Sequence, residues 1–206
     1  MDTWQMIKAE RASLAEDLAA LPDASWDRDS LCDGWTVRDT VGHVISATYN
    51  SPLIFFRKLI ANGFRFNQLS DRDIQAVSAG KSGAELVDLL RSRVDARAAP
   101  PGPRATLLGE VVIHGEDVFR ALGRYRDHPA EHLIAVADFY KGNFILVNSR
   151  KRIAGLSLPA TDIDWRTGTG PEVKGPTIAL ILAMTGRTAA YDDLAGEGVD
   201  VLRQRP

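Results

Sequence analysis

Glu110 and His114 are four residues apart in a segment with helical periodicity, which places a carboxylate and an imidazole on one helix face. Leu107 and Val111 share that face, so it is expected to be buried, and a buried carboxylate must be paired, protonated or bound to a metal. His43, in an earlier helical segment, offers a second imidazole. Two imidazoles and one carboxylate are the ligand set of an open catalytic zinc site, whose fourth position stays free for water or substrate.

The residues alone leave other interpretations open. Glu110 and His114 could form a buried hydrogen-bonded pair without metal, or a slightly rotated helix could leave both exposed. His43 lies off the apolar stripe of its own helix among small or polar neighbours, so it either faces a cavity or is a solvent-exposed histidine. Asp117 follows His114 by about one turn and is predicted either to orient the imidazole or to be an ordinary surface aspartate.

The remaining histidines and the cysteine are weaker candidates. His128 precedes a proline and His132 lies in the polar first turn of its helix, so both are predicted to be surface residues. Cys32 is expected to be a small packing residue or an inert thiol rather than a ligand or nucleophile. As the only cysteine it excludes an internal disulfide, which fits a reducing cytoplasm.

Composition argues against nucleic acid and membrane as partners. The chain has 206 residues, 45 % of them hydrophobic, with a net charge of -2. Its Lys and Arg residues are scattered, whereas phosphate binding needs a clustered basic face. There is no secretory signal pattern and no apolar stretch near the roughly 20 residues needed to span a bilayer. We therefore expect a cytoplasmic protein.

The periodicity predicts an α+β fold that is mainly α. Residues 1–152 are expected to form an up-and-down four-helix bundle, and residues 153–206 a small α+β domain. Thr36 and Asp39 have the spacing of a capping box at the start of the helix that carries His43. Helices are predicted over residues 3–21, 36–61 with a bend near Pro52, 70–78, 82–97, 104–122, 130–148, 177–185 and 198–204. Strands are predicted near residues 155–158, 163–166 and 172–175.

Three stretches resemble the mycothiol-dependent maleylpyruvate isomerase family of DinB-like metal-binding bundles. Residues 32–43, CDGWTVRDTVGH, are similar to the family's segment before its first metal histidine. Residues 110–117, EVVIHGED, are similar to its Glu-x-x-x-His-x-x-Asp segment. The tail from residue 161, with TGTGP, Gly186-Arg187 and LAGEG, is similar to its small C-terminal domain. Residues 62–102 carry no family signature.

The resemblance implies a zinc ion held by His43, Glu110 and His114, although nitrogen and oxygen ligands also suit Ni, Fe or Mn. It implies mycothiol, a small-molecule thiol, as co-substrate, activated as thiolate for addition to an electrophilic small molecule. The reaction would be a cis-trans isomerisation or an S-transfer. Arg187 would bind a substrate carboxylate or stabilise an enolate; alternatively, it only interacts with a helix C-terminus.

Two further hypotheses compete with a thiol-dependent enzyme. The protein could hold or sense a small ligand without catalysis, with residues 62–102 shaping a different pocket. It could also be a bundle without metal, in which Glu110 and His114 form a structural pair. The sequence does not determine the substrate, the loaded metal or the oligomeric state.

Overall fold

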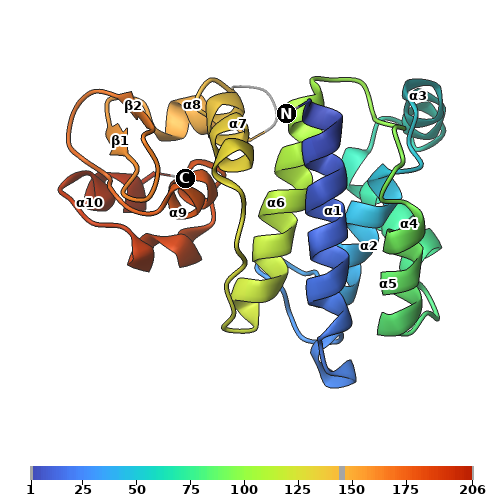
Figure 1. Ribbon diagram of the computed structural model, residues 1–206. Helices are drawn as coiled ribbons and strands as arrows, with labels where there is room; N and C mark the ends of the chain where they lie inside the picture. Colours follow the sequence, from blue (N-terminus) through green and yellow to red (C-terminus); the bar gives the residue numbers. More distant parts are fainter. Residues whose placement is uncertain (1, 144–146, 206) are drawn as a thin grey trace. The chain divides into compact units, whose positions relative to one another are not determined.

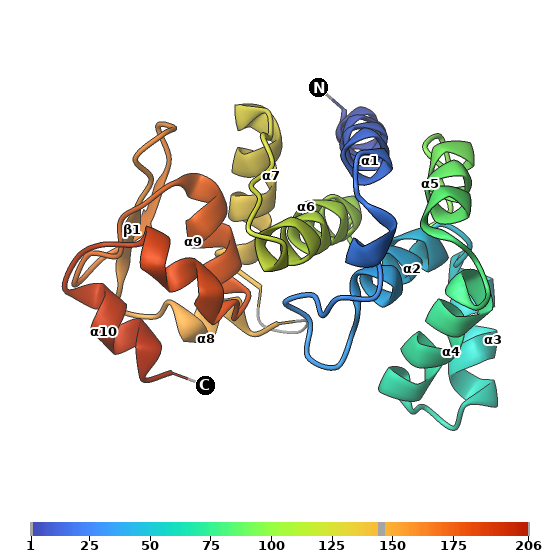
Figure 2. The same cartoon turned by 90° about the horizontal axis from the view of Figure 1, so that it is seen from below.

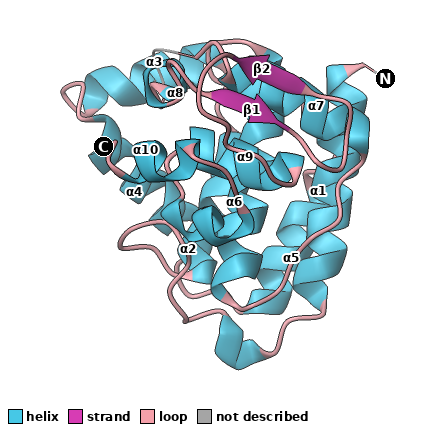
Figure 3. Cartoon of the chain, turned by 90° about the vertical axis from the view of Figure 1, so that its left-hand side faces the viewer, coloured by secondary structure: helices cyan, strands magenta, loops and turns pink. Residues whose placement is uncertain are grey.

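In the computed structural model, which describes residues 2–143 and 147–205, the chain is mainly helical with one small two-stranded sheet (Figures 1 and 3). This confirms the predicted α+β, mainly α class. The chain divides into two compact units, Met1–Asp127 and His128–Pro206. None of the described helices is long and apolar enough to cross a membrane.

The first unit is entirely helical apart from its loops and turns. Its helices are α1 (Thr3–Ala19), η1 (Asp23–Ser25), α2 (Val37–Ala47), α3 (Pro52–Ala61), α4 (Phe66–Ser78), α5 (Gly83–Ser92) and α6 (Arg104–Ala121). α1 packs against α5 and α6, and α2 packs against α4, α5 and α6 (Figures 1 and 2). The shared core is formed by buried side chains of α1, α2, α5 and α6, among them Leu14, Leu18, Val41, Ile45, Leu86, Leu90, Val111 and Val118.

Local signals start the helices that position the candidate site. The Thr36 hydroxyl accepts a hydrogen bond from the Asp39 backbone N–H at 3.2 Å, and the Asp39 carboxylate accepts one from the Thr36 N–H at 3.1 Å. This is the predicted capping box, and it fixes the first residue of α2. The predicted single helix over residues 36–61 is instead two helices, because Ser51 caps a new helix with Pro52 at its first position.

The second unit is built around α9 (Thr177–Met184), of which every residue except Ile178 is buried. The Asp162 carboxylate accepts hydrogen bonds from the backbone N–H and hydroxyl of Thr177 at 2.8 and 2.7 Å, at the start of this helix. Around α9 pack α7 (Ala130–Tyr140), α8 (Ser149–Arg152) and η2 (Thr188–Asp193), and α10 (Gly198–Arg203) contacts η2. The helix predicted to reach residue 148 therefore ends at Tyr140, and residues 144–146 lie outside the described part.

The sheet pairs β1 (Ser157–Pro159) and β2 (Arg166–Gly168) in antiparallel register, with Ser157 opposite Gly168. The predicted third strand, residues 172–175, forms only isolated bridges, from Glu172 to Ser157, from Gly175 to Ala160 and from Lys174 to Ala195. Prolines on both sides of this short segment remove backbone donors that a longer ladder would need.

The sequence placed the boundary between the parts of the chain at residue 152, where helical periodicity gives way to strands. The compact units divide 25 residues earlier, after Asp127. The reason is packing: α7 is helical like the first unit, but it contacts α9 of the second. A change in secondary structure and a change in packing partner need not coincide along the chain.

Candidate metal centre

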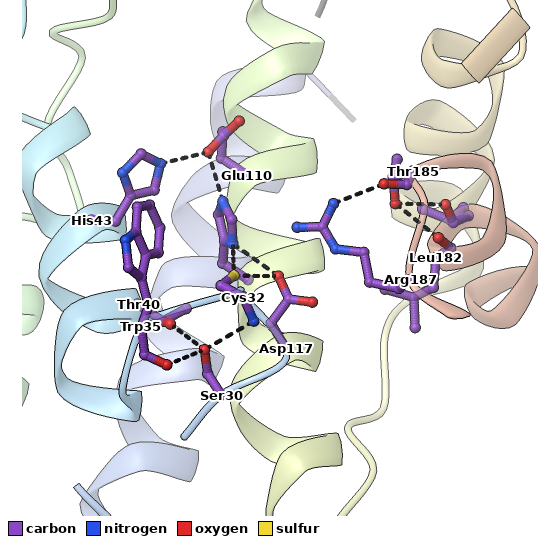
Figure 4. Close-up of polar contacts among 12 residues, drawn as sticks. Ser30, Cys32, Trp35, Thr40, His43, Glu110, Asp117, Leu182, Thr185 and Arg187 are labelled. Atoms are coloured by element: carbon purple, nitrogen blue, oxygen red, sulfur yellow. Dashed lines mark hydrogen bonds and ion pairs between the residues drawn. The ribbon is translucent and has the colours of Figure 1, made fainter. Parts of the chain in front are cut away.

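One face of α6 carries the polar side chains of the site. Glu110, His114 and Asp117 are at positions i, i+4 and i+7, so they follow each other along the helix (Figure 4). His43 reaches the same place from α2, and its ring faces Glu110. The packing of α2 against α6 therefore brings together residues that are 67 positions apart in the sequence.

The carboxylate of Glu110 lies between two imidazoles. Its Oε2 atom is 3.0 Å from Nε2 of His43 and 3.1 Å from Nε2 of His114. The two imidazole rings meet edge to face, with centroids 4.9 Å apart. All three predicted metal ligands are thus in one cluster, and each directs its donor atom inward.

Asp117 controls the second nitrogen of His114. Its Oδ2 atom is 3.0 Å from Nδ1 of His114, and its side chain is completely buried. An ionised carboxylate only accepts hydrogen bonds, so the proton belongs on Nδ1 and Asp117 holds it there. In the neutral tautomer the lone pair of His114 then lies on Nε2 and faces Glu110 and His43. The first interpretation of Asp117, as a residue that orients the imidazole, is the one that this contact supports.

The electrostatics of the metal-free cluster follow from these contacts. Burial by itself would raise the pKa of Glu110, but hydrogen bonds from His114 and His43 outweigh it and hold that pKa well below its usual value. The pKa of the His114 imidazole moves in the opposite direction. Burial would lower this pKa, but hydrogen bonds to Asp117, Cys32 and Glu110 outweigh burial and raise it well above its usual value. Both shifts favour the charged forms, the carboxylate of Glu110 and the imidazolium of His114.

The donor set fits a divalent metal ion. The donor atoms of His43, Glu110 and His114 all lie within 4.8 Å of one another. The ligand atoms of a tetrahedral zinc ion, each about 2.1 Å from the metal, would be roughly 3.4 Å from one another. This separation lies between the 3.0 Å from His43 Nε2 to Glu110 Oε2 and the 4.8 Å within which all three donor atoms lie. The ligand side chains retain 22 %, 29 % and 12 % of their exposure, so the cluster is accessible to a small molecule.

Cys32 lies in this cluster, contrary to the prediction of an inert packing residue. Its thiol donates to Oδ2 of Asp117 at 3.1 Å, and its Sγ atom is 3.4 Å from Nδ1 of His114. The three side chains form a second group that could hold a metal. That group is less suited to catalysis, because the Asp117 carboxylate is fully buried and a catalytic metal needs an accessible position. Its contacts instead make Cys32 a partner of the residue that orients His114.

A tightly bonded loop brings Cys32 and Trp35 to the site. The Ser30 hydroxyl donates to the Trp35 carbonyl and accepts from the Cys32 backbone N–H and the Thr40 hydroxyl, at 3.0, 3.1 and 2.8 Å (Figure 4). The Leu31 N–H donates to the backbone carbonyl of Asp117 at 3.0 Å, which ties the loop to α6. The centroid of the Trp35 ring lies 5.0 Å from the centroid of the His43 ring, so Trp35 covers one side of the cluster.

Residues 62–102, which had no recognisable signature, contribute Ser70 of α4. Its hydroxyl is 3.4 Å from Nδ1 of His43, the nitrogen that faces away from Glu110. Sequence reasoning missed this residue because an isolated serine has no diagnostic spacing. It also misplaced His132, which is buried rather than a surface residue, since α7 turns that side toward the interior of its unit. His128 is half-buried.

Arg187 follows α9 in the second unit. Its backbone N–H donates to the Leu182 carbonyl at 2.9 Å, and its guanidinium donates to the Thr185 carbonyl at 3.0 Å (Figure 4). These contacts correspond to the helix C-terminus interpretation of this residue. The predicted role of Arg187 toward a substrate anion stays a prediction.

Comparison with known proteins identifies the family and the fold of the chain. The family model described as the mycothiol maleylpyruvate isomerase N-terminal domain matches residues 7–112. Two solved structures, of mycothiol-dependent maleylpyruvate isomerase and of a histidine-to-alanine mutant of it, have the same fold. Each superposes with a TM-score of 0.64 at 17 % identity, covering 95 % of this chain and 91 % of the other. No curated protein matches the chain by sequence.

Proposed function

Because this chain belongs to the mycothiol maleylpyruvate isomerase family, we propose that His43, Glu110 and His114 hold a zinc ion and serve a thiol-dependent reaction. The observation that carries the proposal is the convergence of three donor atoms from α2 and α6, with one imidazole oriented from behind by a buried carboxylate. The low-molecular-weight thiol would be mycothiol. The substrate would be an electrophilic small molecule, with maleylpyruvate as the first to test.

The charge of the donor set supports a thiol as the incoming ligand. Two neutral imidazoles and one carboxylate leave a single positive charge on a divalent ion, which one thiolate neutralises. When bound, the metal would lower the pKa of a thiol in its open position and so supply thiolate at neutral pH. The thiol proton leaves to solvent in this process.

The protein's own side chains do the positioning. Asp117 keeps the proton of His114 on Nδ1 and thereby presents Nε2 to the cluster. The Ser70 hydroxyl is 3.4 Å from Nδ1 of His43 and can accept a hydrogen bond from the N–H there, which serves the same purpose for the histidine of α2. Trp35 shields one side of the His43 ring from water. These contacts hold the donor atoms close together, so only small shifts are needed to form the ligand set.

Two outcomes are open to the same thiolate. In an isomerisation the sulfur adds to one carbon of a conjugated cis double bond, and the electron pair moves to the neighbouring carbonyl as an enolate. Rotation about the resulting single bond and loss of the thiolate then give the trans product without any net oxidation. In an S-transfer the enolate carbon takes a proton and the C–S bond is kept. Arg187 is the proposed partner of the substrate carboxylate or the enolate.

Elemental analysis of the purified protein tests the metal centre. We expect one divalent ion per chain, lost in His43→Ala and in His114→Ala and retained in His128→Ala, a histidine outside the cluster. The metal centre would be refuted if the protein stayed metal-free after supplementation with zinc and its stability did not change when zinc was added.

Turnover tests the reaction separately. The metal-loaded protein is incubated with mycothiol and either maleylpyruvate or a panel of conjugated electrophiles. Loss of the cis substrate without thiol consumption indicates an isomerase, and stoichiometric thiol consumption indicates an S-transferase. A metal-loaded protein that neither binds mycothiol nor turns over any electrophile would refute the thiol-dependent reaction. Arg187→Lys, which keeps the charge but loses the planar donor pair, tests the arginine.

A further inference from the structure

Helix α3 carries an exposed apolar surface that the metal centre does not use. None of its residues is buried, although most of them are large and apolar. The α3 surface, as defined here, consists of side chains that are each at least 50 % exposed, namely Leu53, Phe56, Ile60, Phe64 and Phe66. At 100° per residue, Leu53, Phe56 and Ile60 form a single stripe along the helix. The remaining two continue the surface through the turn into α4.

The charge of this region is one-sided. Residues 40–70 contain no Asp or Glu, although the whole chain has 27 of them. The basic residues of this stretch are Arg57, Lys58 and Arg65. Lys58 is neutralised by Asp73 of α4 at 2.7 Å. Arg57 and Arg65 are exposed, and no ion-pair partner is recorded for either among the described residues. The α3 surface is therefore apolar, with the cation of Arg57 beside the helix stripe and that of Arg65 in the turn that leads into α4.

The turn after α3 holds its apolar tip at a conformational cost. Gly63 and Phe64 both have left-handed backbone conformations, with φ of 59° and 62°. A phenylalanine in this region is strained by about 1 kcal/mol or more. Burial of the ring does not offset the strain, because Phe64 is 71 % exposed. Such strain at an exposed aromatic residue points to a partner that buries it.

We propose that the α3 surface docks the protein on an anionic membrane surface, contrary to the composition-based expectation of no membrane partner. Such a peripheral contact needs no membrane-spanning helix. An amphipathic helix with a continuous apolar stripe and flanking arginines is suited to the boundary between headgroups and acyl chains. Arginines can extend their heads to phosphates while their stems stay among apolar groups. Symmetric pairing with a second copy is disfavoured, because it would bring together two surfaces with exposed arginines and no carboxylate in residues 40–70. The inference does not depend on the proposed thiol chemistry.

Vesicle flotation with the full-length protein tests the docking. We expect binding to vesicles that contain phosphatidylglycerol and much weaker binding to pure phosphatidylcholine, with release at high salt. The variant with Arg57→Gln and Arg65→Gln should bind roughly tenfold more weakly or worse. The variant with Leu53→Ser, Phe56→Ser and Ile60→Ser should lose binding. The side chains replaced in the two variants are all exposed, so both variants are expected to fold. Circular dichroism checks this.

Matched replacements elsewhere serve as controls. Tyr125→Ser removes an equally exposed aromatic residue, and Arg97→Gln removes an exposed arginine outside the α3 surface; both should leave binding unchanged. The proposal is overturned by no binding to anionic vesicles at low salt, by equal binding to neutral ones, or by binding that survives both variants. It is also overturned if sedimentation shows self-association that the serine variant abolishes while no vesicle binding occurs, since a second copy would then cover the surface.

Discussion

Replacement of Asp117 by asparagine is the sharpest test of how the proposed metal centre is organised. The change keeps the shape of a completely buried side chain and removes only its charge. In the native protein Oδ2 accepts two hydrogen bonds, from Nδ1 of His114 at 3.0 Å and from the thiol of Cys32 at 3.1 Å. The asparagine oxygen can still accept one of them, so His114 should keep its place but lose part of its orientation and basicity.

The magnitude follows from the difference between a charged and a neutral hydrogen bond. Bonds to charged groups contribute about 1.5–3 kcal/mol and neutral ones about 0.5–1.5 kcal/mol, so the loss is on the order of 1–1.5 kcal/mol. About 1.4 kcal/mol corresponds to one factor of ten. Loss of such a partner of a metal-binding histidine typically weakens metal binding 10- to 100-fold. We therefore expect zinc affinity to fall by a factor of ten or somewhat more, at unchanged stoichiometry.

The effect should depend on pH in a defined direction. Asp117 contributes to the raised pKa of His114, so asparagine lowers this pKa and makes the proton a weaker competitor for Nε2. The loss of zinc affinity should consequently be smallest in acid and grow toward alkaline pH, where proton competition ends in both proteins. Competition with a chromogenic chelator across the pH range measures this. A loss that is the same at every pH would indicate a general structural defect instead.

Glu116→Gln is the matched control. Glu116 is also a buried carboxylate of α6, but it accepts its hydrogen bond from Arg120 at 2.6 Å. This variant should lose folding stability without a change in zinc affinity. If Asp117→Asn binds zinc within a factor of two of the native protein at alkaline pH, then the buried carboxylate does not orient His114 and the reasoning fails.

Three further predictions concern Cys32, the Glu110–His114 pair and the cap of α2. Cys32→Ala should weaken zinc binding about two- to fivefold, less than Asp117→Asn does, because a thiol is a weak hydrogen-bonding group. Isothermal titration calorimetry measures this, and complete loss of zinc binding would contradict the prediction. Metal-free protein should be most stable between about pH 4.5 and 6.5. The lowered pKa of Glu110 contributes stability that is lost as the pH falls toward that pKa. The raised pKa of His114 contributes stability that is lost as the pH rises through that pKa. Urea denaturation that shows equal stability at pH 6 and pH 9 would argue against the ion pair. Thr36→Ala removes the cap of α2 and should lower unfolding free energy by about 1 kcal/mol, whereas an unchanged urea midpoint would deny the capping box a role.

Much of the local structure was predictable from short-range signals. The capping box at Thr36 and the proline–glycine boundaries of α6 set helix limits that the structure reproduces within a residue or two. The errors have local causes. Ser51 followed by Pro52 starts a new helix, which a search for one continuous periodic run overlooks. The end of α7 at Tyr140 was missed although Gly142, directly after the C-cap Lys141, is a typical helix-stop signal.

The candidate site divides in the same way. Glu110, His114 and Asp117 lie within eight residues of one helix, so their spacing alone places them on one face. Cys32 was predicted to be inert because its sequence neighbours do not reveal its contact with Asp117, and Ser70 was overlooked as an isolated serine on another helix. No sequence pattern predicts which residues of a loop contact which face of a helix. These contacts depend on how α2, α4 and the loop before α2 pack around α6.

The sequence by itself determined the helical content, the types of the candidate metal ligands and the side of α6 that carries two of them, because these depend on interactions within a few residues. Only the tertiary structure decided that His43 meets Glu110, that the imidazole of His114 is oriented through Nδ1, and that Cys32 shares this contact. Such distances of a few ångströms between remote segments result from core packing, which combines contributions from the whole unit. The same packing left the apolar residues of α3 outside the core, where hydrophobicity alone would have predicted burial.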